Sequence, residues 1–247
     1  LVIPLVLAIA LSKPGAANAL MGIAVVVVIM MPTLTLPALI WVKEPPPQKQ
    51  TESIRWARGL KIVWDNGPYR RLVFCLVFLV TAVSMTASLS FFFVQSVMGQ
   101  SFETYTYFIL AYYLSSAFCI PIWFIISKHL GKHRTVVVGI AWLSLWSAFI
   151  PLMGPDQFGI FFVVMLLKGS AVGALVFLPA SMAADVVDLD TLRTGEQRTG
   201  LYFSLWGMIN KGGAALGVFL ATNLAAYYGF DPSAAENTES AKFALAC

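Results

Sequence analysis

Charged residues are scarce in this sequence. Asp, Glu, Lys and Arg make up 11% of its 247 residues, whereas hydrophobic residues make up 59%. A soluble domain carries about 25% charged residues, so this chain has too few of them to cover a surface in water. The composition therefore excludes an ordinary soluble domain and predicts a protein embedded in a membrane.

Residues suited to metal binding and nucleophilic catalysis are also few. Three cysteines lie far apart in apolar segments, without the spacing of a disulfide or metal site, and we expect them to be small buried hydrophobes: Cys75, Cys119 and Cys247. His129 and His133 are four residues apart, a spacing that fits a metal on a helix, but no third ligand accompanies them. The sequence therefore predicts no metal site and no catalytic residue.

Long apolar runs dominate the chain. Crossing a bilayer takes about 20 apolar residues in a helix, and five segments satisfy this: 17–42, 72–97, 106–127, 135–154 and 157–182. A sixth, 199–228, is interrupted by Asn210, Lys211 and a few small polar residues. Residues 1–11 look like the tail of another span, and "AKFALAC" looks like the start of one more. We expect an all-α polytopic membrane protein with about six complete transmembrane helices, as a fragment of a longer chain.

The connections between these segments alternate in charge. Connection 43–71 holds seven Lys and Arg, "SKHLGKHR" holds three, and the stretch before 199 adds Arg193 and Arg198. The alternate connections hold only Lys13, with Lys242 following the last of them. Because basic loops stay in the cytoplasm, we expect these connections there. The isoelectric point near 9.0 then reflects membrane topology rather than nucleic-acid binding.

Connection 43–71 also divides the chain. It opens with "KEPPPQKQ", an extended linker, and continues with "SIRWARGLKIVW". In the second part, cations and apolar residues form separate stripes at helical spacing: Arg55, Arg58 and Lys61 against Trp56, Leu60 and Val63. This pattern predicts a short amphipathic helix on the inner membrane surface, and a basic disordered linker is the alternative.

A cluster of charges precedes the sixth apolar segment. Asp185 and Asp188 are three apart and share one face of a helix end, while Arg193 and Arg198 are expected in the loop and at the start of the next helix. Three interpretations are open: a solvated loop, a cytoplasmic gate, or a catalytic site, which the arginines and the boundary position disfavour. The gate interpretation includes two cations of "SKHLGKHR", Lys132 and Arg134.

Only two ionisable side chains lie inside the apolar segments. Lys168 precedes "GSAVG", whose spacing of small residues predicts a helix-packing seam, and Gly213 and Gly217 repeat that spacing. Lys211 ends a stripe of small residues at helical spacing: Gly200, Ser204 and Gly207. A charge at this depth costs roughly 3 kcal/mol or more in lipid, so we expect Lys211 to face an aqueous cavity.

Three stretches resemble the major facilitator superfamily, and within it the glycoside–pentoside–hexuronide:cation symporters. They are "DNGPYRRLV", "IPIWFIISKHLGKHR" and "ADVVDLDTLRTGEQRTGLYFSLWGMINKGGAALG". The resemblance implies that residues 1–42 are the end of helix five and helix six of the N-terminal bundle, and 43–71 the central cytoplasmic linker. It makes 72–247 the C-terminal bundle, with helices seven to eleven and the start of helix twelve.

The resemblance also implies roles for single residues. Lys211 matches the family's cavity lysine in helix eleven, and Asp185 and Asp188 match acids at the inner end of helix ten. The coupling ion, Na⁺ or H⁺, is bound mainly by the missing N-terminal helices. Where the melibiose carrier has a polar Gln-Thr pair, this sequence has Trp206 and Gly207.

These observations lead to one functional prediction with alternatives. We expect a secondary transporter of the cell's inner, plasma membrane that couples entry of a sugar or glycoside to a monovalent cation by alternating access. The alternative keeps the fold and carries a lysolipid or an organic anion, and an intramembrane enzyme or a receptor ranks lower. The predicted cavity residues are Lys211, Gly207, Ser204, Asn210, Trp206 and Phe177, and the predicted gate residues are Asp185, Asp188, Arg193, Arg198, Lys132 and Arg134.

Overall fold

The computed structural model describes residues 16–41, 56–154, 157–231, 238 and 245. The chain divides into two compact units, Leu1–Glu52 and Ser53–Cys247, and each is considered by itself. The predicted span tail at 1–11, the proline-rich linker at 43–55 and most of the predicted start of helix twelve lie outside the described residues.

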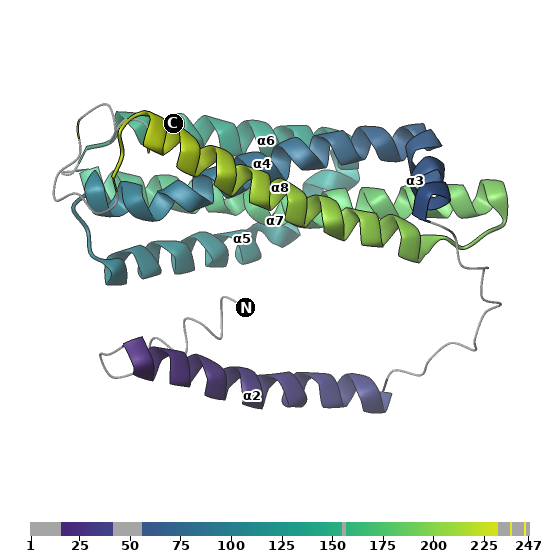
Figure 1. Ribbon diagram of the computed structural model, residues 1–247, viewed down its shortest axis with the longest axis horizontal. Coiled ribbons are helices and arrows are strands. Elements are labelled where there is room, and N and C mark those ends of the chain that lie inside the picture. Colours follow the sequence, from purple (N-terminus) through teal and green to yellow (C-terminus); the bar gives the residue numbers. More distant parts are fainter. Residues whose placement is uncertain (1–15, 42–55, 155–156, 232–237, 239–244, 246–247) are drawn as a thin grey trace. The chain divides into compact units, whose positions relative to one another are not determined.

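The described residues form seven α-helices and one short 3-10 helix, with no strand among them (Figure 1). The first unit contains α2, Ala16–Trp41. The second contains α3 (Trp56–Asp65), α4 (Gly67–Ser96), α5 (Phe102–Leu130), α6 (Lys132–Ser147), the 3-10 helix η1 (Ile150–Leu152), α7 (Phe158–Thr194) and α8 (Thr199–Tyr227). All six predicted spans are therefore helical, and the short helix predicted before residue 71 is confirmed as α3.

Four of these helices are long and apolar enough to cross a membrane: α4, α5, α6 together with η1, and α7. The all-α membrane architecture is confirmed, whereas four of the about six expected spans meet this criterion among the described residues. In α2 the corresponding apolar stretch is shorter, Val27–Trp41. In α8 the polar residues Asn210, Lys211 and Asn223 and several glycines lower the hydropathy of the helix.

Local sequence explains where the helices begin and end. Asn66 caps α4: its side chain accepts a hydrogen bond from the Tyr69 amide at 3.1 Å, and a proline follows in the first turn. Ser101 caps α5 in the same way, through the Thr104 amide at 3.3 Å. Gly195, with φ of 72°, ends α7 in the left-handed conformation that favours glycine.

Helix α7 is longer than the sequence pattern indicated. The apolar run ends near residue 182, but the helix continues to Thr194. The expectation that Arg193 lies in a loop was therefore wrong, because no glycine or proline occurs between residue 182 and Gly195. At 1.5 Å per residue, 37 residues span about 55 Å, so the charged last turns extend well beyond the length that a bilayer core requires.

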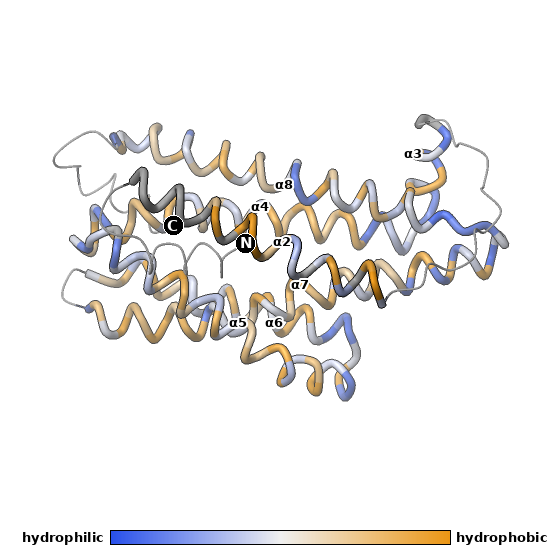
Figure 2. The backbone as a smooth tube through the Cα atoms, turned by 90° about the horizontal axis from the view of Figure 1, so that it is seen from below, coloured by the Kyte–Doolittle hydropathy of each residue, from blue (hydrophilic) through white to orange (hydrophobic). Residues whose placement is uncertain are grey.

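In the second unit α4 packs along α8 (Figures 1 and 2). Glycines make the close approach possible: a Cβ atom on Gly217 would lie 2.5 Å from the Thr81 carbonyl oxygen, and one on Gly213 would lie 3.3 Å from Val80. The Thr81 hydroxyl donates a hydrogen bond to the Gly213 carbonyl at 3.2 Å. The predicted packing seam in α8 is confirmed.

A second group consists of α5, α6 and α7. A Cβ atom on Gly169 would collide with the Tyr112 carbonyl oxygen of α5, and one on Gly173 would lie 2.8 Å from the Ser116 carbonyl oxygen. Two indole N–H groups also join this group: Trp123 donates to the Ser170 carbonyl and Trp142 to the Leu167 carbonyl, both at 2.8 Å. The predicted "GSAVG" seam is confirmed as the contact between α7 and α5.

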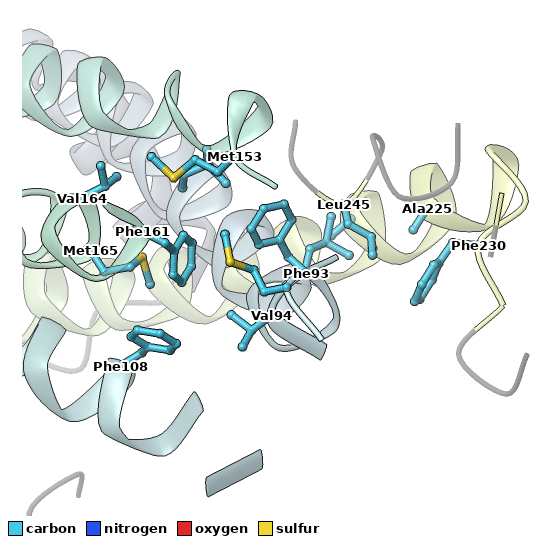
Figure 3. Close-up of a cluster of buried hydrophobic side chains, with 14 residues drawn as sticks. Phe93, Val94, Phe108, Met153, Phe161, Val164, Met165, Ala225, Phe230 and Leu245 are labelled. Atoms are coloured by element: carbon cyan, nitrogen blue, oxygen red, sulfur yellow. The ribbon is translucent and has the colours of Figure 1, made fainter. Parts of the chain in front are cut away.

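Apolar cores lie at both ends of the second unit. The largest contains aromatic rings from α4, α5 and α7 (Figure 3). Phe161 is central to it, with ring centroids 5.1 Å from Phe108 and 5.7 Å from Phe93. Another core joins α3, α4, α7 and α8 around Tyr69 and Tyr202. We call the part of the unit that contains residues 56–71, 128–134 and 185–199 the basic end.

Candidate functional site: the free face of α8 and the basic end

One face of α8 is left open by the packing. The face toward α4 contains buried residues such as Gly213 and Gly217, whereas Lys211 and Ser204 are exposed in this unit. Cβ atoms on Gly200, Gly207 and Gly212 would meet nothing within 4 Å. The stripe of small residues that ends at Lys211 therefore borders open space, and its lysine makes no ion pair or hydrogen bond within the described part of the chain.

The other predicted cavity residues do not all lie together. Asn210 is half-buried and donates to the Trp206 carbonyl of its own helix at 2.8 Å. Trp206 packs against the core around Tyr69 and Tyr202. Phe177 instead packs against a separate core of α5, α6 and α7 that contains Trp123 and Leu178. The structure thus gathers the residues of α8 and places Phe177 in a different cluster.

The two lysines of the apolar segments differ in surroundings. Lys168 has 5% of its surface exposed within this unit, whereas Lys211 is exposed. Because its side chain is accessible, Lys211 is the better candidate for a ligand contact.

An ion pair joins two helices at the basic end. The Lys132 ammonium at the start of α6 donates to both carboxylate oxygens of Asp185 on α7, at 2.8 and 2.6 Å. The side chains are 36% and 59% exposed, so water screens the pair and its contribution to stability is small, about 0–1 kcal/mol. It links the α5–α6 connection to the last turns of α7.

A second group of charges surrounds Arg198 at the start of α8. Its guanidinium binds Glu196 at 2.8 Å and lies 3.7 Å from Asp190 of α7. Arg198 and Asp190 are largely buried, with 13% and 12% of their side chains exposed. Asp190 Oδ2 is shielded from solvent and accepts no hydrogen bond, so Arg198 supplies its compensating charge.

The remaining predicted gate residues are separate from these pairs. Asp188, Arg193 and Arg134 are exposed and form no ion pair among the described residues. Asp190 and Glu196 belong to the same sequence cluster but were not among the predicted gate residues. Their positions in the sequence could have identified them, because Asp190 and Glu196 flank the end of α7 and lie within eight residues of Arg198.

Two buried tyrosines tie α4 to α8 at the same end. The Tyr69 hydroxyl donates to the Tyr202 carbonyl at 2.6 Å, and the ring centroids are 4.8 Å apart in an edge-to-face arrangement. Asn66 donates to the Tyr202 hydroxyl at 3.0 Å. Tyr69 and Tyr202 are 0% and 1% exposed, so the bond from the Tyr69 hydroxyl to the Tyr202 carbonyl is shielded from water. Sequence reasoning missed this junction, because only the Asn66 cap had a recognisable pattern.

A polar cavity of about 330 Å³ adjoins the junction. Its lining comes from α3, the start of α4, the end of α7 and the start of α8: Ile62, Asp65, Asn66, Gly67, Pro68, Leu189, Asp190, Arg193, Thr194 and Arg198. The described residues contain no cluster of three or more His, Cys, Asp or Glu that could hold a metal. The lining mixes both signs of charge: Asp65 and Asp190 with Arg193 and Arg198.

Four long apolar helices, a charged end and a lysine on an otherwise small-residue face define an integral, multi-pass membrane protein. The chain belongs to the MFS/sugar transport protein family, whose profile matches residues 1–247. This match confirms the resemblance to cation symporters of the major facilitator superfamily. It is a family of transporters and not of enzymes.

Individual relatives are also similar. An uncharacterized symporter of Synechocystis is 29% identical over 171 residues, which cover 69% of this chain and 31% of that protein. Sodium-dependent lysophosphatidylcholine symporter 1 of Homo sapiens is 26% identical over 226 residues, covering 91% of this chain and 41% of that protein. The Danio rerio protein named 1-A is 23% identical over 199 residues, covering 80% and 37%. The chain thus spans about a third to two fifths of these relatives.

Proposed function

We propose that this chain is the C-terminal part of a sodium-coupled symporter that carries a lysophospholipid by alternating access. The choice of cargo rests on the similarity of this chain, over 91% of its length, to a symporter named for sodium and lysophosphatidylcholine. The earlier alternative of an amphipathic cargo is therefore better supported than a sugar. The family's description as sugar transport favours a glycoside as the second candidate.

The free face of α8 is suited to such a cargo. A lysophospholipid has a phosphate anion beside an acyl chain, and a lysine ammonium forms a charge-assisted hydrogen bond with phosphate. Lys211 supplies the cation, and Gly207 and Ser204 leave room beside it. Trp206 and Gly207 offer no polar pair for sugar hydroxyls, so the neighbouring surface suits an apolar chain better than a glycoside ring.

The basic end is proposed to face the cytoplasm and to act as its gate. Alternating access requires contacts that hold one side closed and then exchange partners. The exposed Asp188, Arg193 and Arg134 are available to the N-terminal half, while Lys132–Asp185 and Arg198–Asp190 hold the C-terminal side in shape. We assign residues 1–42 to the end of the N-terminal bundle, 43–71 to the cytoplasmic linker and 72–247 to the C-terminal bundle, in the plasma membrane.

Uptake into vesicles distinguishes the two cargoes. Full-length protein is reconstituted, and uptake of labelled lysophosphatidylcholine and of a labelled nitrophenyl galactoside is followed with an inward Na⁺ gradient, without a gradient, and with K⁺ in place of Na⁺. We expect lipid uptake that needs the Na⁺ gradient, and no galactoside uptake. Na⁺-driven uptake of the galactoside alone would reverse the choice of cargo. Lipid uptake that is equal in all three conditions would exclude sodium coupling.

A further inference from the structure

The corner between α3 and α4 carries an exposed apolar surface beside unpaired cations. Helix α3 is docked on the bundle by one side: Val63 is 4% exposed and Gly59 is also buried. Its other side presents Leu60 and Trp64, which are four residues apart and 50% and 59% exposed. An amphipathic helix with tryptophan on its apolar side is typical of helices that lie at a membrane surface.

Contacts with α4 fix the depth of Trp64. Its ring meets Phe74 edge-to-face at 6.1 Å between centroids, and Phe74 lies seven residues into a helix that is long and apolar enough to span a membrane. Seven residues correspond to about 10 Å along the helix. Trp64 is therefore level with the first turns of α4, at the depth where tryptophan concentrates between headgroups and hydrocarbon.

The charge at this corner is mostly positive. Arg58, Lys61 and Arg71 are exposed and form no ion pair in the described residues. Arg70, by contrast, has a partner within the protein: its guanidinium donates to the Trp64 carbonyl at 3.0 Å and lies 5.9 Å from the Trp64 ring centroid. Asp65 is the single described acid of this corner. Lys61 precedes Trp64 by three residues on α3 and Arg71 precedes Phe74 by three on α4, so these cations share helix faces with the two rings. Such a surface complements a phosphate or carboxylate that is attached to acyl chains.

We propose that the α3–α4 corner is a binding site for the headgroup of an acidic phospholipid of the surrounding bilayer. Arg58, Lys61 and Arg71 hold the anion, and Trp64 with Phe74 contacts the upper part of the acyl chains. The lipid is a resident of the membrane and not the transported cargo, so this site does not depend on the proposed function. It holds α3, and with it the end of the linker, at the membrane surface.

Fluorescence quenching by brominated lipids tests the site. Full-length protein is placed in mixed vesicles of phosphatidylcholine and phosphatidylglycerol in which either the one lipid or the other is dibrominated, and the quenching due to Trp64 is the difference between the wild type and Trp64→Phe. The test variant combines three substitutions, Arg58→Gln, Lys61→Gln and Arg71→Gln. The control variant is Lys128→Gln, which removes an exposed cation that lies over Phe124 on α5. In mixed vesicles at low salt we expect the acidic lipid to be enriched near Trp64 by at least about threefold.

The triple variant should lose this enrichment, and Lys128→Gln should keep it. Raising the salt to about 0.5 M should weaken the enrichment by screening. The proposal fails if Trp64 is quenched by neither lipid, if both lipids quench it equally, or if Lys128→Gln lowers the enrichment as much as the triple variant. None of these outcomes requires transport, so a failure here is distinct from a failure of the proposed cargo.

Discussion

At the scale of single residues, the glycines of α8 divide into those that touch α4 and those that border open space. Gly213 and Gly217 allow the backbones to meet, whereas Gly207 and Gly212 leave room for something else. This division separates a structural face from a candidate transport face on one helix. The same contrast provides matched variants that differ only in the face that receives a methyl group.

Gly217→Ala should destabilise the protein by about 1–3 kcal/mol, because the new Cβ atom would lie 2.5 Å from the Thr81 carbonyl oxygen and the helices must move apart. Gly212→Ala, on the open face, should be neutral or stabilise the protein by up to about 1 kcal/mol through helix propensity. Thermal unfolding of the purified full-length protein measures both. Equal melting temperatures for the two variants would contradict the described α4–α8 seam.

Tyr69→Phe tests the junction between α4 and α8. It removes a hydroxyl and leaves the buried Tyr202 carbonyl without its partner at 2.6 Å, which should cost about 1–2 kcal/mol of stability. Tyr107→Phe is the control, because Tyr107 is 69% exposed and should be nearly neutral. Thermal unfolding measures the stability of both variants. If Tyr69→Phe loses no more stability than Tyr107→Phe, the junction does not stabilise the protein.

At the scale of helices, the second unit consists of a pair, α4 with α8, and a group of three, α5, α6 and α7. Each set is held by small residues and hydrogen bonds to backbone carbonyls. The contact between the sets at the basic end includes Asp190 with Arg198. Lys132 and Asp185 join α6 to α7 within the group of three, and their exposure keeps the contribution of the pair to stability small.

Reversing this pair tests the gate. Lys132→Asp or Asp185→Lys alone removes an exposed ion pair, and this loss should lower the free energy of unfolding by less than about 1 kcal/mol. Repulsion between the two like charges adds to that loss. Each single reversal should speed the reaction of Ser204→Cys on α8 with a thiol reagent added at the basic end. The double reversal restores opposite charges and should restore the slow rate. Rates that are unaffected by either single reversal would reduce the pair to a solvated contact.

Much of this architecture could be predicted from the sequence, because helix length, hydropathy and the spacing of small residues follow directly from it. Length and hydropathy identify the helices, and the small residues at 169, 173, 213 and 217 have few other uses at that spacing. The extension of α7 to Thr194 was missed because polar residues do not by themselves end a helix. The Tyr69–Tyr202 junction was missed because neither tyrosine has a sequence pattern that indicates its partner on another helix.

The candidate site was predicted less completely than the helices. Lys211 and its stripe of small residues lie on one open face, as their spacing indicated. Phe177 packs in another cluster, because its position on α7 faces α5 and α6 and the helix periodicity alone did not assign the neighbour. Asp190 belongs with Arg198 through tertiary contact, which charge spacing along the chain does not specify.

At the scale of the whole molecule, the alternation of basic connections makes a prediction about orientation. In full-length protein without other reactive cysteines, Leu130→Cys at the basic end should react with an impermeant thiol reagent from the cytoplasmic side only. Gln157→Cys, before α7, should react from the opposite side only. Labelling intact cells and inverted vesicles measures both positions. Reaction of both cysteines from one side would contradict the orientation that places the gate in the cytoplasm.

Sodium-driven uptake by variants of Lys211 tests most directly whether the free face of α8 carries the cargo. Full-length protein with Lys211→Leu should still insert and fold, because Lys211 has no partner among the described residues. It should lose Na⁺-driven uptake of lysophosphatidylcholine by about tenfold or more, the effect of removing one charge-assisted hydrogen bond. Lys211→Arg should retain part of the uptake, since the broader guanidinium fits a point-charge site less well, and Lys128→Gln should transport as the wild type does. Wild-type uptake kinetics in Lys211→Leu would contradict the assignment of this face to transport.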